Sequence, residues 1–336
     1  MAGVDFLFLD RSTVEGLVPP LRELMPVVET ALRAHGEGAV VMPPKGHLYL
    51  EEQFNGHFNI LKGYVQPAGL AGVKVISDYV DNYRVGLPSE IALLTLYDPR
   101  TGAPVALMDA TTLTWLRTGS VTGIGARHLA RPDSRILTHI GARGTAFANI
   151  EAVAANFALE EVRIASARPE TRTRLAEEVR RRLGLNARAI ELGRDLVEDA
   201  DIVIEATRLE APRDLIAEPW MKPGSLLISY GFVRAVDATL PRKVDRFVVD
   251  DWNQCTMAGT FHSEIAAGRL TRDHLHAEIG EIVTGRKHGR TDAQERTLFW
   301  HRGMGIIDVV VGGYLLAAAR KAGLGVPLTL WDGRTE

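Results

Sequence analysis

The stretch RILTHIGARGTA, residues 135–146, decides the fold of this chain. Its apolar run, 136–140, is typical of a short buried strand, and apolar residues over 150–157 follow at helical spacing. Between them, glycine at 141 permits a tight turn, and glycine at 144 permits close approach of the backbone to a phosphate. A strand, a glycine turn and a helix in this order are typical of a dinucleotide-binding unit.

The glycine turn departs from the usual dinucleotide pattern. That pattern is G-x-G-x-x-G/A, and Arg143 occupies the position of its second glycine. Arg143 either adds a phosphate contact or weakens dinucleotide binding, and an ordinary strand–turn–helix is the alternative interpretation. Ala146 provides the small residue that helix–strand packing requires. We expect the whole turn to contact the cofactor: Gly141, Ala142, Arg143, Gly144, Thr145 and Ala146.

Further apolar runs alternate with helical patterns after this turn. They predict strands at 162–165, 187–190, 200–207, 225–229 and 246–250. Strands that alternate with helices indicate parallel pairing with helical crossovers. The central part of the chain is therefore expected to be an α/β, doubly wound, Rossmann-type domain.

The end of the predicted strand 162–165 bears on the type of cofactor. A carboxylate there would bind the ribose 2′-hydroxyl of NAD, but this chain has Ser166 and Arg168, with Arg172 one turn further on. A hydroxyl and a guanidinium suit a 2′-phosphate, so the pattern favours NADP(H), with NAD(H) as the alternative. The arginines can also be read as a solvated helix start.

The first hundred residues predict a different sheet. Apolar runs at 92–97 and 105–108 flank a turn of Asp, Pro, Arg, Thr and Gly, which indicates an antiparallel hairpin. A further strand is expected at 72–77. A long apolar helix is expected over 306–322, close to the end of the sequence.

Composition excludes several classes of protein. The 336 residues include 39 basic and 42 acidic side chains, so the net charge is −3, which argues against nucleic-acid and membrane-surface partners. The single cysteine, Cys255, permits no internal disulfide, and no apolar run reaches the about 20 residues of a spanning helix. The first residues lack a signal-peptide pattern, and the histidines show no convincing metal-ligand spacing. We therefore expect a cytoplasmic, two-domain protein without a metal.

A series of short motifs carries a family resemblance. Lys74 is followed by Gly-Leu-Pro at 86–88, by Thr-Gly-Ala-Pro-Val-Ala at 101–106 and by Leu-Thr-Trp-Leu-Arg-Thr at 113–118. Similar elements continue at 278–285 and include Gly303 and Asp308. The order resembles the ornithine cyclodeaminase/mu-crystallin family over about residues 40–330.

The resemblance implies a homodimer whose subunit has two domains. Residues 1–120 plus 305–336 would bind substrate and form the dimer, and residues 121–304 would be the inserted Rossmann domain. Enzymes of this family use NAD(H) or NADP(H) to interconvert amino acids with imino or 2-oxo acids, or cyclise diamino acids. Mu-crystallin is a ketimine reductase that also binds thyroid hormone. The expected partner is therefore a small carboxylate substrate, which is an imino, 2-oxo or amino acid.

The resemblance also implies roles for individual residues. Arg117 would bind the substrate carboxylate, Lys74 would serve as the catalytic lysine, and Lys45 would replace a substrate-binding arginine. His301 is a weaker candidate for a proton donor or substrate contact. The further cofactor contacts would be Thr118 at the phosphates, Ala206 and Thr207 on the adenosine side, and Gly231 and Gly303 at the nicotinamide.

One departure from the family pattern separates the candidate reactions. Ornithine cyclodeaminases have a catalytic aspartate two residues after the glycine that aligns with Gly231, and here that residue is Val233. The sequence therefore favours a reductase or amino-acid dehydrogenase over a lyase of the cyclodeaminase or hydroxyproline-dehydratase type. A mu-crystallin-like binding protein is a third interpretation. Arg234, Lys45 and His47 add cations, which suggests an imino-dicarboxylate as one substrate.

Overall fold

The computed structural model describes residues 3–333, which form two compact units. Unit 1 combines the residues up to Arg117 with those from Met304 onward, and unit 2 is Thr118–Gly303. The first boundary falls inside helix α4 (Thr111–Leu129), so this helix contributes to both units. None of the helices in the described residues has both the length and the apolar character needed to cross a bilayer.

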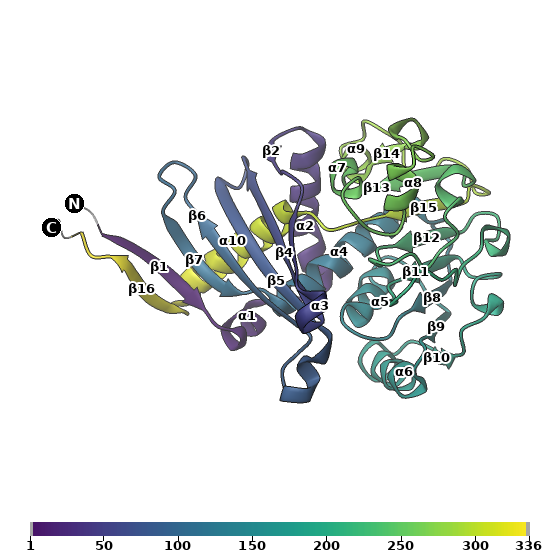
Figure 1. Cartoon of the computed structure of the whole chain (residues 1–336), viewed down its shortest axis with the longest axis horizontal. Coiled ribbons are helices and arrows are strands. Elements are labelled where there is room, and N and C mark those ends of the chain that lie inside the picture. Colours follow the sequence, from purple (N-terminus) through teal and green to yellow (C-terminus); the bar gives the residue numbers. More distant parts are fainter. Residues whose placement is uncertain (1–2, 334–336) are drawn as a thin grey trace. The chain divides into compact units, whose positions relative to one another are not determined.

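Unit 2 contains a parallel sheet with the strand order β10-β9-β8-β11-β12-β15-β13-β14 (Figure 1). Its strands are β8 (Ile136–Ile140), β9 (Glu161–Ala165), β10 (Ala187–Ile190), β11 (Ile202–Glu205), β12 (Leu226–Ser229), β13 (Arg246–Val249), β14 (Ala277–Glu278) and β15 (Thr297–Trp300). The first six positions follow the order of a dinucleotide-binding sheet, because the order reverses between β8 and β11. The predicted doubly wound α/β domain is confirmed.

Helices connect the strands of unit 2. They are α5 (Ala146–Ala154), α6 (Pro169–Leu183), α7 (Trp252–Cys255), α8 (His262–Ala266), α9 (Ile279–Val283) and the short 3₁₀ turns η2 (Arg194–Leu196), η3 (Glu218–Trp220), η4 (Leu240–Arg242) and η5 (Arg272–His274). The central strands β11, β12 and β15 are buried along their whole length. Their carboxyl ends therefore form a rigid edge on which loop residues can be positioned.

Unit 1 contains a mixed sheet with the order β16-β1-β7-β6-β5-β4-β2, and β3 pairs with β4. Its strands are β1 (Val4–Leu9), β2 (Val40–Val41), β3 (Gly46–Tyr49), β4 (Gly56–Val65), β5 (Leu70–Tyr79), β6 (Glu90–Tyr97), β7 (Pro104–Asp109) and β16 (Val326–Trp331). β6 and β7 pair antiparallel, which confirms the predicted hairpin. The helical elements are α1 (Arg11–Leu17), α2 (Leu21–Gly36), α3 (Glu51–Phe54), α10 (Gly305–Ala322), the 3₁₀ helix η1 (Val80–Val85) and the first part of α4.

Helix α10 covers one face of this sheet (Figure 1). The approach is close, because a Cβ added to Gly312 would lie 2.5 Å from the Leu94 side chain. Alternation along the strands separates the two faces: Leu94 is fully buried, whereas Leu93 is 49% exposed. Lys74 pairs in register with Leu94, so its side chain lies on the buried face under α10.

Candidate functional site

Lys74 lies at the centre of a buried polar cluster in unit 1. Its Nζ donates hydrogen bonds to Asp308 Oδ1 at 2.7 Å and to Thr114 Oγ1 at 3.0 Å. Burial, followed by repulsion from Arg117, lowers the pKa of Lys74 from 10.5 to about 8. A lysine with that pKa can exchange a proton near neutral pH, which an exposed lysine cannot do efficiently.

Arg117 belongs to the same cluster. Its Nε donates to Asp308 Oδ1 at 3.0 Å, and only 6% of the residue is exposed. Within residues 3–333, no hydrogen bond from its two terminal guanidinium nitrogens is found, so they can bind a carboxylate in the bidentate manner typical of arginine. The structure therefore brings together Lys74 and Arg117, which are two of the four residues with predicted catalytic roles.

Asp308 joins the two cations, and sequence reasoning assigned no role to it. It is fully buried in the first turn of α10, and its Oδ2 has no hydrogen-bond partner among the described residues. With Lys74 protonated, two cations and one carboxylate leave the cluster with a net positive charge, which suits an anionic substrate. The signal was present in the sequence as a single acid among the isoleucines and valines of the predicted apolar helix.

Lys45 precedes the strand β3. It is half-buried, immediately before β3, and it is not among the groups hydrogen-bonded to Asp308. β3 pairs with β4, which in turn pairs with β5, so Lys45 directly precedes a strand of the sheet that contains Lys74. Its predicted role in substrate binding stays a prediction.

In unit 2, the glycine loop between β8 and α5 contacts the loop after β11. Gly141 has a φ of +106°, and a Cβ there would lie 2.5 Å from the carbonyl oxygen of Ala206. Any other residue would therefore force the two loops apart. The N-terminus of α5 has no side-chain cap hydrogen bond, so backbone N–H groups of its first turn can bind an anion. This cradle fits a dinucleotide phosphate.

The other residues of the loop differ in exposure. Ala142 and Ala146 are buried, whereas Arg143 and Gly144 are exposed. Thr145 is half-buried directly before α5. The exposed Arg143 guanidinium therefore has room to approach a phosphate. This is compatible with the expectation that Arg143 adds a phosphate contact.

A hydrogen-bond network that the sequence did not predict supports the glycine loop. His139 lies on β8, and burial lowers its pKa to about 4, so the ring is neutral. Its Nδ1 then donates to the Gly141 carbonyl at 2.8 Å, and its Nε2 accepts from Asn149 Nδ2 at 3.0 Å. Asn149 also donates to the Tyr230 hydroxyl, at 2.5 Å.

Tyr230 extends this network to His301. Its hydroxyl bonds to Thr145 Oγ1 at 2.5 Å, and its ring lies 4.6 Å from the His301 ring, centroid to centroid. His301 is 2% exposed, and its Nε2 lies 3.3 Å from Thr122 Oγ1 on α4. Thr118, a predicted phosphate contact, is also a buried residue of α4. The network thus links the glycine loop to His301 through side chains of unit 2.

Two buried carboxylates hold the other predicted cofactor residues. Glu205 accepts from Thr207 N at 2.7 Å, and a Cβ on Gly231 would lie 3.1 Å from both of its oxygens. Asp250 accepts from the backbone N of Gly303 at 2.7 Å, and burial raises its pKa. Acids that end buried apolar strands are a signal that sequence reasoning passed over.

Ser166 and Arg168 lie after β9, as predicted. Ser166 Oγ donates to the Arg168 carbonyl at 2.9 Å, and Arg172 Nη1 donates to the Ser166 carbonyl at 2.8 Å. Arg172 also pairs with Glu191, whereas the Arg168 side chain is exposed. Of the two arginines, Arg168 is therefore the better placed to accept a new anionic partner.

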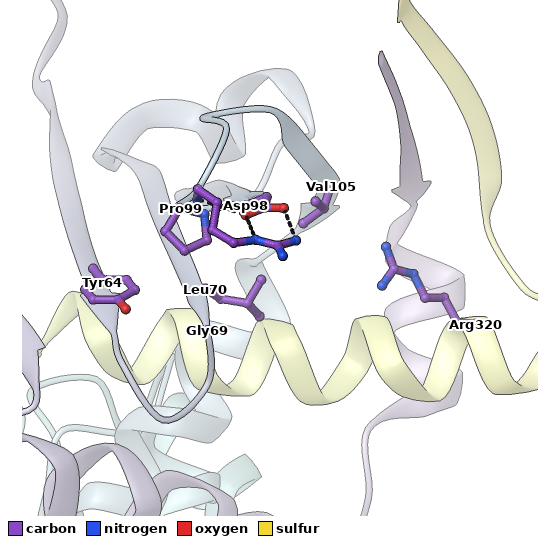
Figure 2. A pocket seen from close by; sticks show the side chains of 8 residues that line it. Tyr64, Gly69, Leu70, Asp98, Pro99, Val105 and Arg320 are labelled. Carbon is purple, nitrogen blue, oxygen red and sulfur yellow. Dashed lines mark hydrogen bonds and ion pairs between the residues drawn. The ribbon is translucent and has the colours of Figure 1, made fainter. Parts of the chain in front are cut away.

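A cavity in unit 1 is separate from the cluster of Lys74, Arg117 and Asp308. It lies among the turns of the β4–β5 and β6–β7 hairpins and the end of α10, and Arg100 there forms a bidentate pair with Asp98 (Figure 2). The lining residues are Tyr64, Gly69, Leu70, Asp98, Pro99, Arg100, Val105 and Arg320. None of the predicted site residues lines this cavity.

Comparison with known proteins identifies the family of the chain. A sequence model of the ornithine cyclodeaminase/mu-crystallin family matches residues 5–321. The chain belongs to this family. The resemblance inferred from the motifs is therefore confirmed over nearly the whole sequence.

Several known proteins are similar to the chain over nearly their whole lengths. Alanine dehydrogenase of Archaeoglobus fulgidus is 30% identical over 326 residues, which is 96% of this chain and 98% of that protein. The structure of Thermococcus litoralis Δ1-pyrroline-2-carboxylate reductase with NADH and L-proline has a TM-score of 0.89 at 32% identity and covers 96% of this chain and 99% of that one. An archaeal alanine dehydrogenase dimer with bound NAD has a TM-score of 0.89 at 29% identity, with coverages of 97% and 100%.

Arg234 was expected to add a positive charge for a second substrate carboxylate, but the structure pairs it with an acid. It pairs with the Asp214 carboxylate and donates to the Val236 carbonyl at 3.1 Å. A neutralised guanidinium offers little attraction to a second substrate carboxylate. The main argument for an imino-dicarboxylate is therefore weakened.

Proposed function

We propose that the chain is an NAD(P)-dependent oxidoreductase that acts on CH–NH and CH–NH₂ groups. It would reduce a small imino acid, or a 2-oxo acid together with an amine, to an amino acid, and the reaction would be reversible. The observation that carries this proposal is the buried Lys74–Asp308–Arg117 cluster, in which burial lowers the pKa of Lys74 to about 8. Alanine dehydrogenase and Δ1-pyrroline-2-carboxylate reductase among its relatives support the reaction class.

Each residue of the cluster has a distinct role in this proposal. The terminal nitrogens of Arg117 bind the α-carboxylate and fix the α-carbon. Lys74 donates a proton to the developing amine nitrogen during reduction and accepts it during oxidation. Asp308 is a positioning residue, because it holds both cations at their nitrogens. When bound, the dinucleotide supplies or accepts the hydride.

Unit 2 supplies the proposed dinucleotide site. The N–H groups before and within the first turn of α5 would hold the pyrophosphate, and Gly141 keeps the path to it open. Gly231 and Gly303 would lie against the nicotinamide, where the absence of a side chain leaves room for the ring. Unit 1 would bind the substrate, so each unit would have one function: substrate binding in unit 1 and cofactor binding in unit 2.

The preferred cofactor is proposed to be NADP(H). No acid lies directly at the end of β9, where Ser166, Ala167 and Arg168 follow, and the exposed Arg168 guanidinium before α6 suits a 2′-phosphate. The relatives with bound cofactor contain NADH or NAD, so both dinucleotides belong in every test.

Arg168→Ala tests this preference. We expect the Kd for NADPH to rise about tenfold, because a charge-assisted contact to the 2′-phosphate is lost, and the Kd for NADH to change little. Titration of dihydronicotinamide fluorescence measures both constants. Arg174→Ala, an exposed arginine on the same helix, is the matched control. Equal affinities for NADPH in the two variants would exclude Arg168 as a 2′-phosphate contact.

The pH dependence of kcat/KM should follow the protonation of Lys74. Because the acid form is needed for reduction, kcat/KM for reduction should fall as pH rises through about 8, and kcat/KM for amino-acid oxidation should rise through about 8. Steady-state rates between pH 6 and 10 at saturating cofactor test this. In Lys74→Arg the limb near pH 8 should disappear, because arginine stays protonated throughout this range. An unchanged limb in that variant would assign the titration to another group.

The defining experiment is a screen for oxidation of NADPH and NADH. The panel contains cyclic imines and 2-oxo acids with ammonia or methylamine, and we expect turnover with a small monocarboxylate. Stoichiometric cofactor oxidation separates a reductase from a lyase, which would regenerate its cofactor. A substrate analogue that binds without turnover would instead favour a mu-crystallin-like binding protein. The absence of oxidation with every substrate would contradict the proposed reaction.

We also propose that the chain is a homodimer through the uncovered face of the unit 1 sheet. Apolar side chains project from this face of β5 and β6, including Val75, Ile91 and Leu93, which are 39%, 37% and 49% exposed. Contiguous exposed apolar surface is typical of an interface. The alanine dehydrogenase relative is described as a dimer, and light scattering should give twice the mass of the 36.8 kDa chain.

A further inference from the structure

Glu205 is a buried carboxylate that the proposed mechanism does not use. It is the last residue of β11, it is fully buried, and no lysine, arginine or histidine forms an ion pair with it among residues 3–333. Such a group is costly to bury without a cation, so its retention calls for a compensating interaction.

Hydrogen-bond donors satisfy both oxygens of this carboxyl group. Oε1 accepts from Thr207 N at 2.7 Å and from Thr207 Oγ1 at 2.5 Å, and Oε2 accepts from Ser229 Oγ at 2.8 Å. The backbone N–H of Gly231 also donates to the carboxyl group. Burial raises the pKa of Glu205, and these hydrogen bonds act in the opposite direction. Backbone N–H groups can only donate, so their contacts favour the charged form of the carboxyl group over the neutral acid.

The charge lies directly below the surface of the proposed cofactor site. A Cβ on Gly231 would lie 3.1 Å from each Glu205 oxygen and 3.2 Å from the Thr207 carbonyl, so a side chain there would crowd the carboxyl group. The carboxylate is therefore separated by one glycine backbone from the surface that the proposed function assigns to the nicotinamide. The inference below rests on that assignment.

We propose that Glu205 sets the preference of the protein between oxidised and reduced cofactor. The nicotinamide ring is cationic when oxidised and neutral when reduced, while the rest of the dinucleotide is the same. A buried negative charge stabilises the cationic ring and leaves the neutral ring almost unaffected. A unit charge about 10 Å away, at an effective dielectric constant of about 20, changes an affinity by about tenfold.

The test compares the Kd of oxidised and reduced cofactor in the intact protein and its variants. The reduced form is titrated by its fluorescence, and the oxidised form by calorimetry. In Glu205→Gln we expect the ratio of the two constants, oxidised over reduced, to rise about tenfold. Glu205→Asp keeps the charge and should keep the ratio near that of the natural protein. Glu198→Gln removes an exposed acid of unit 2 and controls for a general change in charge.

Other outcomes separate this inference from the proposed function. Equal weakening of both cofactor forms in Glu205→Gln would mean that Glu205 only shapes the loops, and it would overturn the inference. The same ratio shift in Glu205→Asp as in Glu205→Gln would also overturn it, because the charge is retained there. If the natural protein binds neither form, the proposed function itself fails. Thermal unfolding of each variant verifies that it is folded before titration.

Discussion

Replacing Lys74 with methionine is expected to lower kcat/KM for imine reduction by about three orders of magnitude, because proton donation to the nitrogen and a positive charge beside it are both lost. Methionine has a similar length and suits the buried position under α10. Steady-state kinetics on the substrate found by the screen measure the loss. The Kd for NADPH should stay within about twofold, since cofactor contacts are assigned to unit 2.

The matched control for this variant is Lys321→Met. Lys321 is an exposed lysine in the last turn of α10, so its removal should leave kcat/KM within about twofold of the natural protein. A Lys74→Met protein that is folded and retains more than about a tenth of the activity would exclude Lys74 as the proton donor.

Replacing Asp308 with alanine is expected to lower the free energy of unfolding by about 3–5 kcal/mol, because Lys74 and Arg117 would be left as buried cations without their shared carboxylate. Urea denaturation measures this change. Activity should fall as well, since both cations lose the group that positions them.

A double variant measures the coupling between Lys74 and Asp308. Adding Lys74→Met to Asp308→Ala removes one of the two buried cations, so the double variant should recover part of the lost stability. Strictly additive losses in the two single variants would mean that the Lys74–Asp308 bond contributes no coupling energy. That result would contradict the proposed role of Asp308.

Most strands and helices of unit 2 could be predicted from the sequence. Buried parallel strands are short and mostly apolar, so 136–140, 162–165 and 225–229 were evident from sequence. β15 (Thr297–Trp300) was missed, because four buried residues without a flanking glycine turn give no periodicity to recognise. β4 (Gly56–Val65) was missed because its polar residues interrupt the apolar alternation.

The candidate site was predictable only in part. Lys74 and Arg117 were found through the family motifs, but neither their shared bond to Asp308 nor the lowered pKa of Lys74 can be read from spacing alone. An acid in the first turn of a helix is ordinarily explained by its favourable interaction with the helix dipole. The position of Asp308 therefore gave no reason to assign it a role in the site. The network from His139 through Asn149 to Tyr230 joins a strand, a helix and a loop that are distant in sequence, and no local pattern predicts such contacts.

Helix α10 is synthesised long after the sheet that it covers, which has a consequence for folding during biosynthesis. Lys74 and Asp308 are 234 positions apart in sequence, and all of unit 2 is synthesised between them. Domains generally fold as units while the chain emerges, so unit 2 can complete its sheet before α10 exists. The ribosome must therefore release almost the whole chain before Lys74 acquires its counter-ion. A nascent chain that stops before α10 would carry an open sheet, which makes chaperone binding and degradation the expected fate of truncated products.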